Sequence, residues 1–153
     1  MPDAIRFDGT AQGAGLAARV RREALRIAAQ HHQLDEFHAV FEDALARGDV
    51  SSARVSFANF GGALEAHFSL EEEFYFPALH GYRRDLAGEL ARFSHEHAAL
   101  RTGMAQLTQQ LARGQLAACK LELEAWVAQL LAHERLEEAL LASPPPTSTI
   151  APR

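Results

Sequence analysis

Four stretches of this chain place apolar residues at alternating steps of three and four, and each of these stripes is interrupted by a histidine. Such steps keep side chains on one face of an α-helix, the face that a helix buries in a bundle. The stripes run from Val20 to Leu45, Phe57 to Phe74, Leu86 to Leu111 and Cys119 to Leu140. The pattern predicts an all-α, up-down-up-down antiparallel four-helix bundle.

Glycine and proline mark the ends of the expected helices. The first runs from Leu16 to Arg47 and stops at Gly48-Asp49, since glycine commonly ends helices. Ser51 or Ser52 can cap a second helix that runs to about Tyr75 and is closed by Pro77. The third and fourth span about 83–113 and 115–142, so that the domain covers 16–142, between a flexible leader (1–15) and a proline-rich tail (143–153).

Composition agrees with one helical domain. Of 153 residues, 30 are Ala and 20 are Leu, whereas Val, Ile and Thr together contribute 13, too few for a sizeable sheet. The net charge is −5, with 14 Arg and one Lys, which argues against a nucleic-acid partner. A single cysteine, Cys119, excludes an internal disulfide framework. Without an apolar signal region or a membrane-spanning stretch, we expect a cytoplasmic protein with no membrane partner.

The chain also repeats itself at a distance of 66 residues. This shift carries His31 onto His97, His67 onto His133, and Glu71-Glu72 onto Glu137-Glu138. It also carries Leu45-Ala46-Arg47-Gly48 onto Leu111-Ala112-Arg113-Gly114. The repeat predicts two helical hairpins related by a pseudo-twofold axis.

Four of the histidines on these stripes, His31, His67, His97 and His133, are expected to lie at one level of the bundle and are called the stripe histidines below. In an antiparallel hairpin, two residues at the same height are equally far from the turn. The midpoints of 31 and 67, of 67 and 97, and of 97 and 133 are 49, 82 and 115, and each lies at or beside a glycine-containing turn. Two stripes also carry a glutamate one helical turn after the histidine. The expected inward-facing cluster comprises His31, His67, Glu71, His97, His133 and Glu137.

The other histidines do not fit this cluster. His32 and His95 lie about 100° and 200° around their helices from the stripe histidines, so they should point away from the core. His80 falls in the expected turn. His38 lies on the first stripe but two turns from His31, where it suits a pocket wall or a contact to a ligand residue.

Four imidazoles and two carboxylates at one level are a ligand set for iron or manganese rather than for a closed zinc site of four ligands. A buried carboxylate is costly unless it is paired or bound to metal. Six ligands suit two metal ions bridged by both carboxylates, with room for a hydroxide bridge and an exogenous ligand. The alternatives are a bundle whose core histidines are merely hydrogen-bonded, and a ferritin-like site. The latter needs Glu-x-x-His motifs, which are absent at the stripe histidines.

The sequence resembles the hemerythrin family, specifically its bacterial cation-binding domains. Four segments in order carry the resemblance: His31-x-x-Leu34-Asp35, His67-Phe-Ser-Leu-Glu71-Glu-Glu-Phe-Tyr-Phe76-Pro77, Glu96-His97-x-x-Leu100-Arg101 and His133-Glu-Arg-Leu-Glu137-Glu138. The resemblance implies a non-haem di-iron centre, oxo- or hydroxo-bridged, with manganese or zinc as substitutes. It further implies that the protein binds or senses dioxygen, iron or redox state.

Two departures from the oxygen-carrying members alter this expectation. Those members have a further histidine where this chain has Phe93, and their last carboxylate is an aspartate five residues after its histidine, whereas Glu137 follows His133 at four. Six ligands therefore replace seven, which argues against simple oxygen carriage. A binding or sensing module with dioxygen or a similar small ligand is the leading hypothesis. A di-iron oxidase or peroxidase-like enzyme, with His38 or Tyr75 as proton donor, and a partner-binding bundle with a vestigial site are the alternatives.

Overall fold

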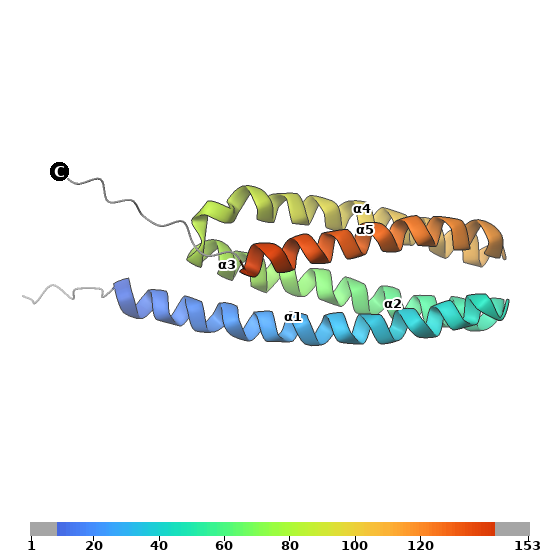
Figure 1. Ribbon diagram of the computed structural model, residues 1–153, viewed down its shortest axis with the longest axis horizontal. Coiled ribbons are helices and arrows are strands. Elements are labelled where there is room, and N and C mark those ends of the chain that lie inside the picture. The colour runs from blue at the N-terminus through green and yellow to red at the C-terminus, as the bar shows by residue number, and fades with distance from the viewer. Residues whose placement is uncertain (1–8, 143–153) are drawn as a thin grey trace, which may run out of the picture.

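The computed structural model describes residues 9–142, and every regular element in that range is helical. Four long helices form the body of the molecule: α1 (Gly9–Ala46), α2 (Val50–Leu70), α4 (Ala87–Ala112) and α5 (Leu116–Ala142), which extend along one axis (Figure 1). The all-α prediction is confirmed. Since α1 begins at Gly9, residues 9–15 are helical where a leader was expected. The proline-rich tail lies outside the described residues.

Two tight turns end α1 and α4 at the predicted glycines. Gly48 and Gly114 have φ angles of 66° and 69°, in the left-handed region that glycine adopts without steric cost. The cap of α2 differs from the prediction. Asp49, rather than Ser51 or Ser52, caps this helix: its carboxylate accepts from the Ser52 N–H at 3.0 Å and from the Ser52 hydroxyl at 2.7 Å.

The second predicted helix does not end at Tyr75 or Pro77. It continues through a π-helical segment, η1 (Glu71–Tyr75), into α3 (Phe76–Tyr82), where the Phe76 N–H donates to the Glu71 carbonyl. One extra residue per π turn rotates the following residues, so Phe74 is exposed and Tyr75 takes the core position predicted for Phe74. His80 lies on α3 and is exposed, not in a turn.

A short 3₁₀ turn, η2 (Arg84–Leu86), leads from α3 into α4. The guanidinium of Arg83 donates to Asp85 at 2.7 and 2.9 Å and fastens this corner. The third predicted helix, 83–113, therefore begins with an irregular corner, and the continuous helix starts at Ala87.

The apolar core consists of two clusters. One is built around Phe41, Phe57, Phe60 and Trp126, and the other around Ile27, Tyr75, Phe76, Leu90 and Phe93. On α1 and α4, His31 and His97 fall in sequence between residues of the two clusters, and on α2 and η1 the first cluster ends at Phe68 and the second begins at Leu70, between His67 and Glu71. The core thus encloses the candidate site from both ends of the bundle.

Close helix approach is visible at two glycines. A Cβ on Gly103 would collide with the Trp126 ring, whose Nε1 donates to the Leu100 carbonyl at 2.9 Å. A Cβ on Gly61 would lie 3.0 Å from Met104 Sδ, while Gly62 has open space around its Cα. Gly103 therefore lets α4 and α5 pack closely around the indole.

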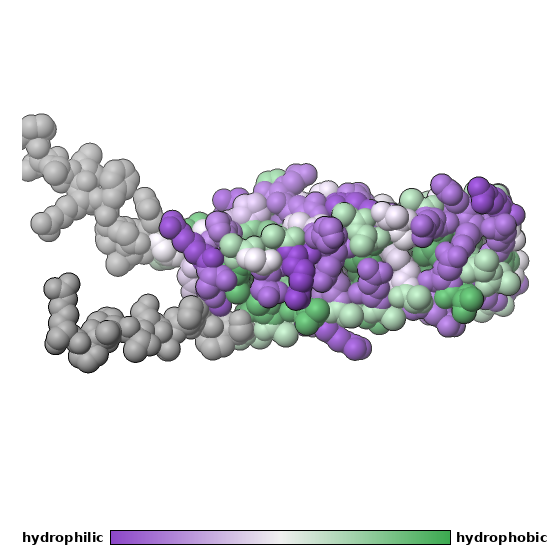
Figure 2. All heavy atoms as spheres, turned by 90° about the horizontal axis from the view of Figure 1, so that it is seen from above, coloured by the Kyte–Doolittle hydropathy of each residue, from purple (hydrophilic) through white to green (hydrophobic). Residues whose placement is uncertain are grey.

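One face of the molecule, shown in Figure 2, is mostly hydrophilic with smaller hydrophobic areas between. Among the described residues, no helix combines the length and hydropathy that crossing a bilayer requires. Cys119 is fully buried in the first core cluster, where burial raises the pKa of its thiol.

Candidate metal centre

The four stripe histidines point their Nε2 atoms inward in two pairs. The Nε2 atoms of His31 (α1) and His67 (α2) lie 3.1 Å apart, and those of His97 (α4) and His133 (α5) lie 3.0 Å apart. Two imidazole nitrogens bound at right angles to one ion, at about 2.1 Å each, are separated by about 3.0 Å. The spacing within each pair therefore fits a shared metal ion.

The outer nitrogen of each ring faces a side-chain oxygen. Nδ1 of His67 donates to Gln30 at 3.0 Å, Nδ1 of His97 to Glu72 at 2.8 Å, and Nδ1 of His133 to Glu96 at 2.6 Å. Nδ1 of His31 lies 3.6 Å from the Glu138 carboxylate. An imidazole that donates from Nδ1 presents a lone pair at Nε2, which is the arrangement found in metal-ligating histidines.

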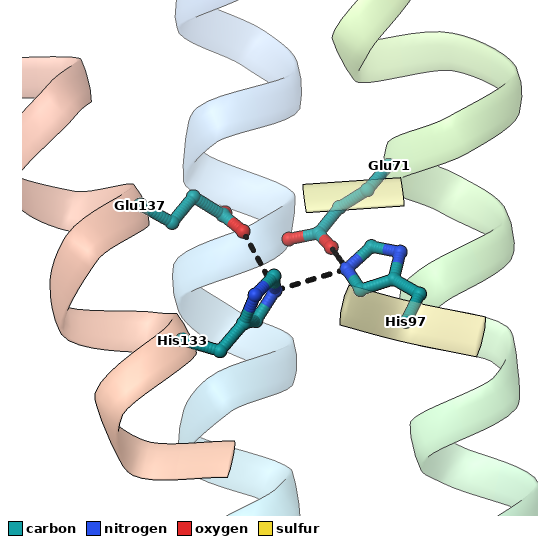
Figure 3. Close-up of side chains that lie close together, drawn as sticks. All are labelled: Glu71, His97, His133 and Glu137. Atoms are coloured by element: carbon teal, nitrogen blue, oxygen red, sulfur yellow. Dashed lines mark hydrogen bonds and ion pairs between the residues drawn. The ribbon is translucent and has the colours of Figure 1, made fainter. Parts of the chain in front are cut away.

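Glu71 and Glu137 bring two carboxylates to the same point from η1 and α5. The Glu71 oxygens lie 3.1 Å from Nε2 of His67 and 3.1 Å from Nε2 of His97, so this side chain reaches both histidine pairs. Glu137 lies 3.6 Å from Nε2 of His133. Figure 3 shows Glu71, His97, His133 and Glu137 converging.

Neither carboxylate is satisfied by the surrounding protein. Glu71 is 0% and Glu137 1% exposed, yet none of their four oxygens has a hydrogen-bond partner of good geometry among the described residues. Buried, unpaired carboxylate oxygens are strongly unfavourable. A cation between these oxygens and the facing imidazole lone pairs would satisfy both.

The two carboxyl groups differ in pKa. Burial alone would raise the pKa of Glu71, but its contacts with the imidazoles of His67 and His97 outweigh burial and lower it below the usual range. Burial and the charge of Glu71 together raise the pKa of Glu137 to about 11. Because the two shifts are opposite, a single proton shared by the pair is favoured when no cation is present.

Two groups of side chains have ligand atoms close enough together to hold an ion. One consists of His31, His67 and Glu71, and the other of Glu71, His97, His133 and Glu137. Glu71 belongs to both groups, as a bridging carboxylate would, whereas Glu137 belongs to the second alone. The structure thus brings together all six residues that the sequence singled out.

The remaining histidines lie apart from these groups. His32 and His95 are exposed, as expected. His38 lines a small hollow with Asp35 and Glu134, and its Nε2 lies 3.4 Å from Glu42. At the position where oxygen carriers have a further histidine, the buried Phe93 ring packs with its centroid 5.3 Å from that of His133.

Sequence reasoning missed the partners of the imidazole Nδ1 atoms. The four residues are Gln30, Glu72, Glu96 and Glu138. A signal was present, because each of them adjoins a stripe histidine or glutamate in sequence. A neighbour on a helix lies about 100° away and can reach the ring of the adjacent helix.

A helical bundle that buries histidines together with unpaired carboxylates is typical of metal-binding proteins. Comparison with protein families matches residues 24–143 to the hemerythrin HHE cation-binding domain. The chain belongs to this family. Comparisons with curated proteins and with solved structures gave no match.

Proposed function

We propose that this protein holds two iron ions, without haem, and uses them to bind dioxygen or a similar small ligand, or to sense iron or redox state. The observation that carries the proposal is the pair of buried carboxylates, Glu71 and Glu137, whose oxygens lack hydrogen-bond partners among the described residues and face imidazole nitrogens. When bound, a ferrous pair supplies the electrons that dioxygen binding draws on.

Iron is favoured over zinc by the chemistry of the donors. The set contains four imidazoles and two carboxylates, whereas structural zinc sites have four ligands and commonly include cysteine. The one cysteine, Cys119, lies in the apolar core and belongs to neither ligand group. Manganese or zinc are substitutes that the same donors accept.

The proposal includes an antiparallel up-down-up-down course and a pseudo-twofold relation between the α1–α2 and α4–α5 hairpins. Within each hairpin the helices pack together, and α2 also packs on α4. The 66-residue shift relates the two histidine pairs and also the Nδ1 contacts: Gln30 to His67 corresponds to Glu96 to His133, and Glu138 to His31 corresponds to Glu72 to His97.

Metal stoichiometry tests the proposal directly. We expect protein loaded anaerobically with Fe²⁺ and then desalted to retain about two ions per chain, because two ligand groups share Glu71. Elemental analysis against protein concentration measures this value. Saturation at one ion, or tetrahedral zinc binding without iron uptake, would contradict the di-iron assignment.

One observation favours the enzymatic alternative, an oxidase or peroxidase-like activity at the same centre. Tyr75 is fully buried, and burial together with the negative charge of the Glu71–Glu137 pair raises its pKa, so the phenol keeps its proton at neutral pH. A buried phenol beside the site could donate a proton to a reduced ligand.

Tyr75→Phe separates the two functions. For a binding or sensing module, we expect this variant to bind the same amount of iron and to consume hydrogen peroxide at the slow rate of the wild type. Peroxide consumption by iron-loaded protein measures the difference. A drop of about a hundredfold, the scale of a lost proton donor, would instead establish the enzyme. Tyr82→Phe, on an exposed tyrosine, is the control.

A further inference from the structure

We propose that α1 is a dimerisation helix: the side of α1 that faces away from the bundle pairs, in antiparallel orientation, with the same side of α1 in a second copy of this chain. The residues that carry this inference are distinct from the six candidate metal ligands, so it stands independently of what the metal centre does.

The surface in question runs along the longest described helix. Figure 1 shows α1 extending along the lower edge of the molecule for its whole length. Its buried residues Ile27, Leu34 and Phe41 recur every seven positions, on the side that packs against α2 and α3. The residues about 180° around the helix from them are all exposed and again step by three and four. We call this set the outer face of α1: Arg22, Leu25, Ala29, Gln33, Glu36, Val40 and Asp43.

The outer face contains the two large apolar side chains of α1 that are exposed among the described residues. Leu25 is 73% and Val40 60% exposed. Single apolar residues are ordinary on a protein surface. What distinguishes these two is their placement, because they lie equally far from the midpoint between His32 and Gln33.

That midpoint makes the outer face complementary to itself. In an antiparallel pair of identical helices related by a twofold axis, residues at the same height have numbers with a constant sum. With the axis between residues 32 and 33 the sum is 65, so that Leu25 lies opposite Val40 of the second copy. The same sum places Arg22 opposite Asp43. Apolar meets apolar and basic meets acidic, each twice by symmetry.

The charges of α1 are divided between its two halves. Residues 16–30 include four Arg and one Glu, whereas residues 31–46 include two Asp, two Glu and neither Lys nor Arg. Arg19, Arg21 and Arg22 have no ion-pair partner within the described range 9–142. An antiparallel second copy brings a basic half against an acidic half, whereas a parallel copy would bring Arg22 against Arg22.

This division of charge favours a second copy over a uniformly charged partner. A nucleic acid or an acidic peptide would be attracted by residues 19–26 and repelled by residues 35–43 of the same helix. A second copy carries both signs in the order that the outer face requires, and such complementarity fixes orientation and register.

The contact is long but narrow. The sum of 65 also pairs Ala18 with Arg47, so the two helices can lie together over about 45 Å. One helix from each copy makes a small interface, so we expect a dissociation constant in the micromolar range, about 1–100 μM.

Sedimentation velocity of the full-length protein, from about 1 to 500 μM, tests the inference. Arg22→Asp sets a carboxylate opposite Asp43 of the second copy, and Asp43→Arg sets a guanidinium opposite Arg22. Each variant should raise the dissociation constant of the dimer by at least about tenfold, because like charges then face each other twice. Arg135→Asp and Glu124→Arg, the matched exchanges at exposed residues of α5, should leave it unchanged.

A mixture of the two variants separates loss of the interface from loss of the fold. In an equimolar mixture of Arg22→Asp and Asp43→Arg, each introduced charge faces an opposite charge on the other chain. We therefore expect the mixture, and likewise the double variant that carries both exchanges, to dimerise about as well as the wild type. Circular dichroism checks that every variant stays helical, and misfolded chains would not recover on mixing.

The apolar part of the contact has its own matched pair. Leu25 and Leu121 are both 73% exposed, on α1 and α5 respectively. Leu25→Gln should weaken the dimer by about tenfold, since two leucine contacts are lost, and Leu121→Gln should not. A wild type that is monomeric at 500 μM, a dimer that the α1 exchanges do not weaken, or a variant mixture that stays monomeric overturns the inference.

Discussion

His97→Ala is expected to remove most of the bound metal, whereas His95→Ala, two residues earlier on the same helix, should leave the metal content unchanged. His97 is fully buried, and its Nε2 lies 3.0 Å from His133 and 3.1 Å from Glu71, while His95 is exposed. We expect the affinity for metal to fall by more than about a hundredfold. Replacing a residue that only hydrogen-bonds to a metal ligand already costs up to that much affinity. Iron per chain after anaerobic loading measures the effect.

His31 and His32 provide a second matched pair on α1. His31 faces His67, while the His32 side chain is 81% exposed. His31→Ala should lower the iron content, and His32→Ala should not. Equal losses within either pair would mean that α1 or α4 is rotated relative to its partners, and that the ligand set is wrong.

Removing the metal is expected to lower the melting temperature by roughly 10 °C. A ligand at a thousandfold excess over its dissociation constant stabilises the folded state by about 4 kcal/mol, and a chain of this size changes its melting temperature by about 2–4 °C per kcal/mol. Thermal melts of the apo and loaded forms measure the difference. An unchanged melting temperature would mean that the cluster does not depend on a cation.

Glu137→Gln should remove most of the pH dependence of apoprotein stability just above neutral pH. The pKa of this carboxyl rises from 4.5 to about 11 in the fold, so the folded chain keeps a proton that the unfolded chain has lost. The free energy of unfolding of the apo wild type should therefore fall by up to about 1.4 kcal/mol per pH unit between about pH 7.5 and 9.5. Glutamine cannot titrate, so the slope should fall to the smaller part contributed by Cys119 and Tyr75, whose pKa values are also raised in the fold.

Glu71 does not contribute to that slope. Its pKa is lowered in the fold, so the stability that it contributes is already complete above the ordinary value of 4.5 and is lost only as the pH falls below it. Urea denaturation at several pH values measures the slope, with Glu124→Gln, on an exposed residue of the same helix, as control. A slope in Glu137→Gln equal to that of the wild type would show that Glu137 is ionised in the apoprotein.

The helical period by itself identified the fold class and the six clustered side chains. Steps of three and four assign each residue to a helix face, and the distance of each histidine from a glycine turn gives its height. The helix face and the height of a residue both follow from the regular geometry of the helix. For this reason the sequence groups His31, His67, His97 and His133, whose Nε2 atoms face one another in pairs in the structure, and it sets aside His32 and His95, which are exposed.

Sequence rules predicted the ends of the helices less accurately than their buried faces. The Asp49 cap was missed because aspartate and serine compete at this turn, and only the backbone geometry selects between them. Pro77 did not end the helix, because the π segment before it gives the chain another way to accommodate a residue without an N–H. Because of the π segment, Tyr75 is buried in the core and Phe74, which was predicted there, is exposed.

Only the tertiary structure decided how the two halves of the centre differ. The sequence repeat relates His31 to His97 and makes the site look symmetric. The same 66-residue shift, however, relates unlike residues: Gln30 to Glu96, Asp35 to Arg101 and Phe76 to Ala142. Which side chain stands behind which imidazole depends on the rotation and stagger of neighbouring helices, and a periodicity within one helix carries no information about either. The packing of α1, α2, α4 and α5 therefore determined the Nδ1 partners and the opening beside His31.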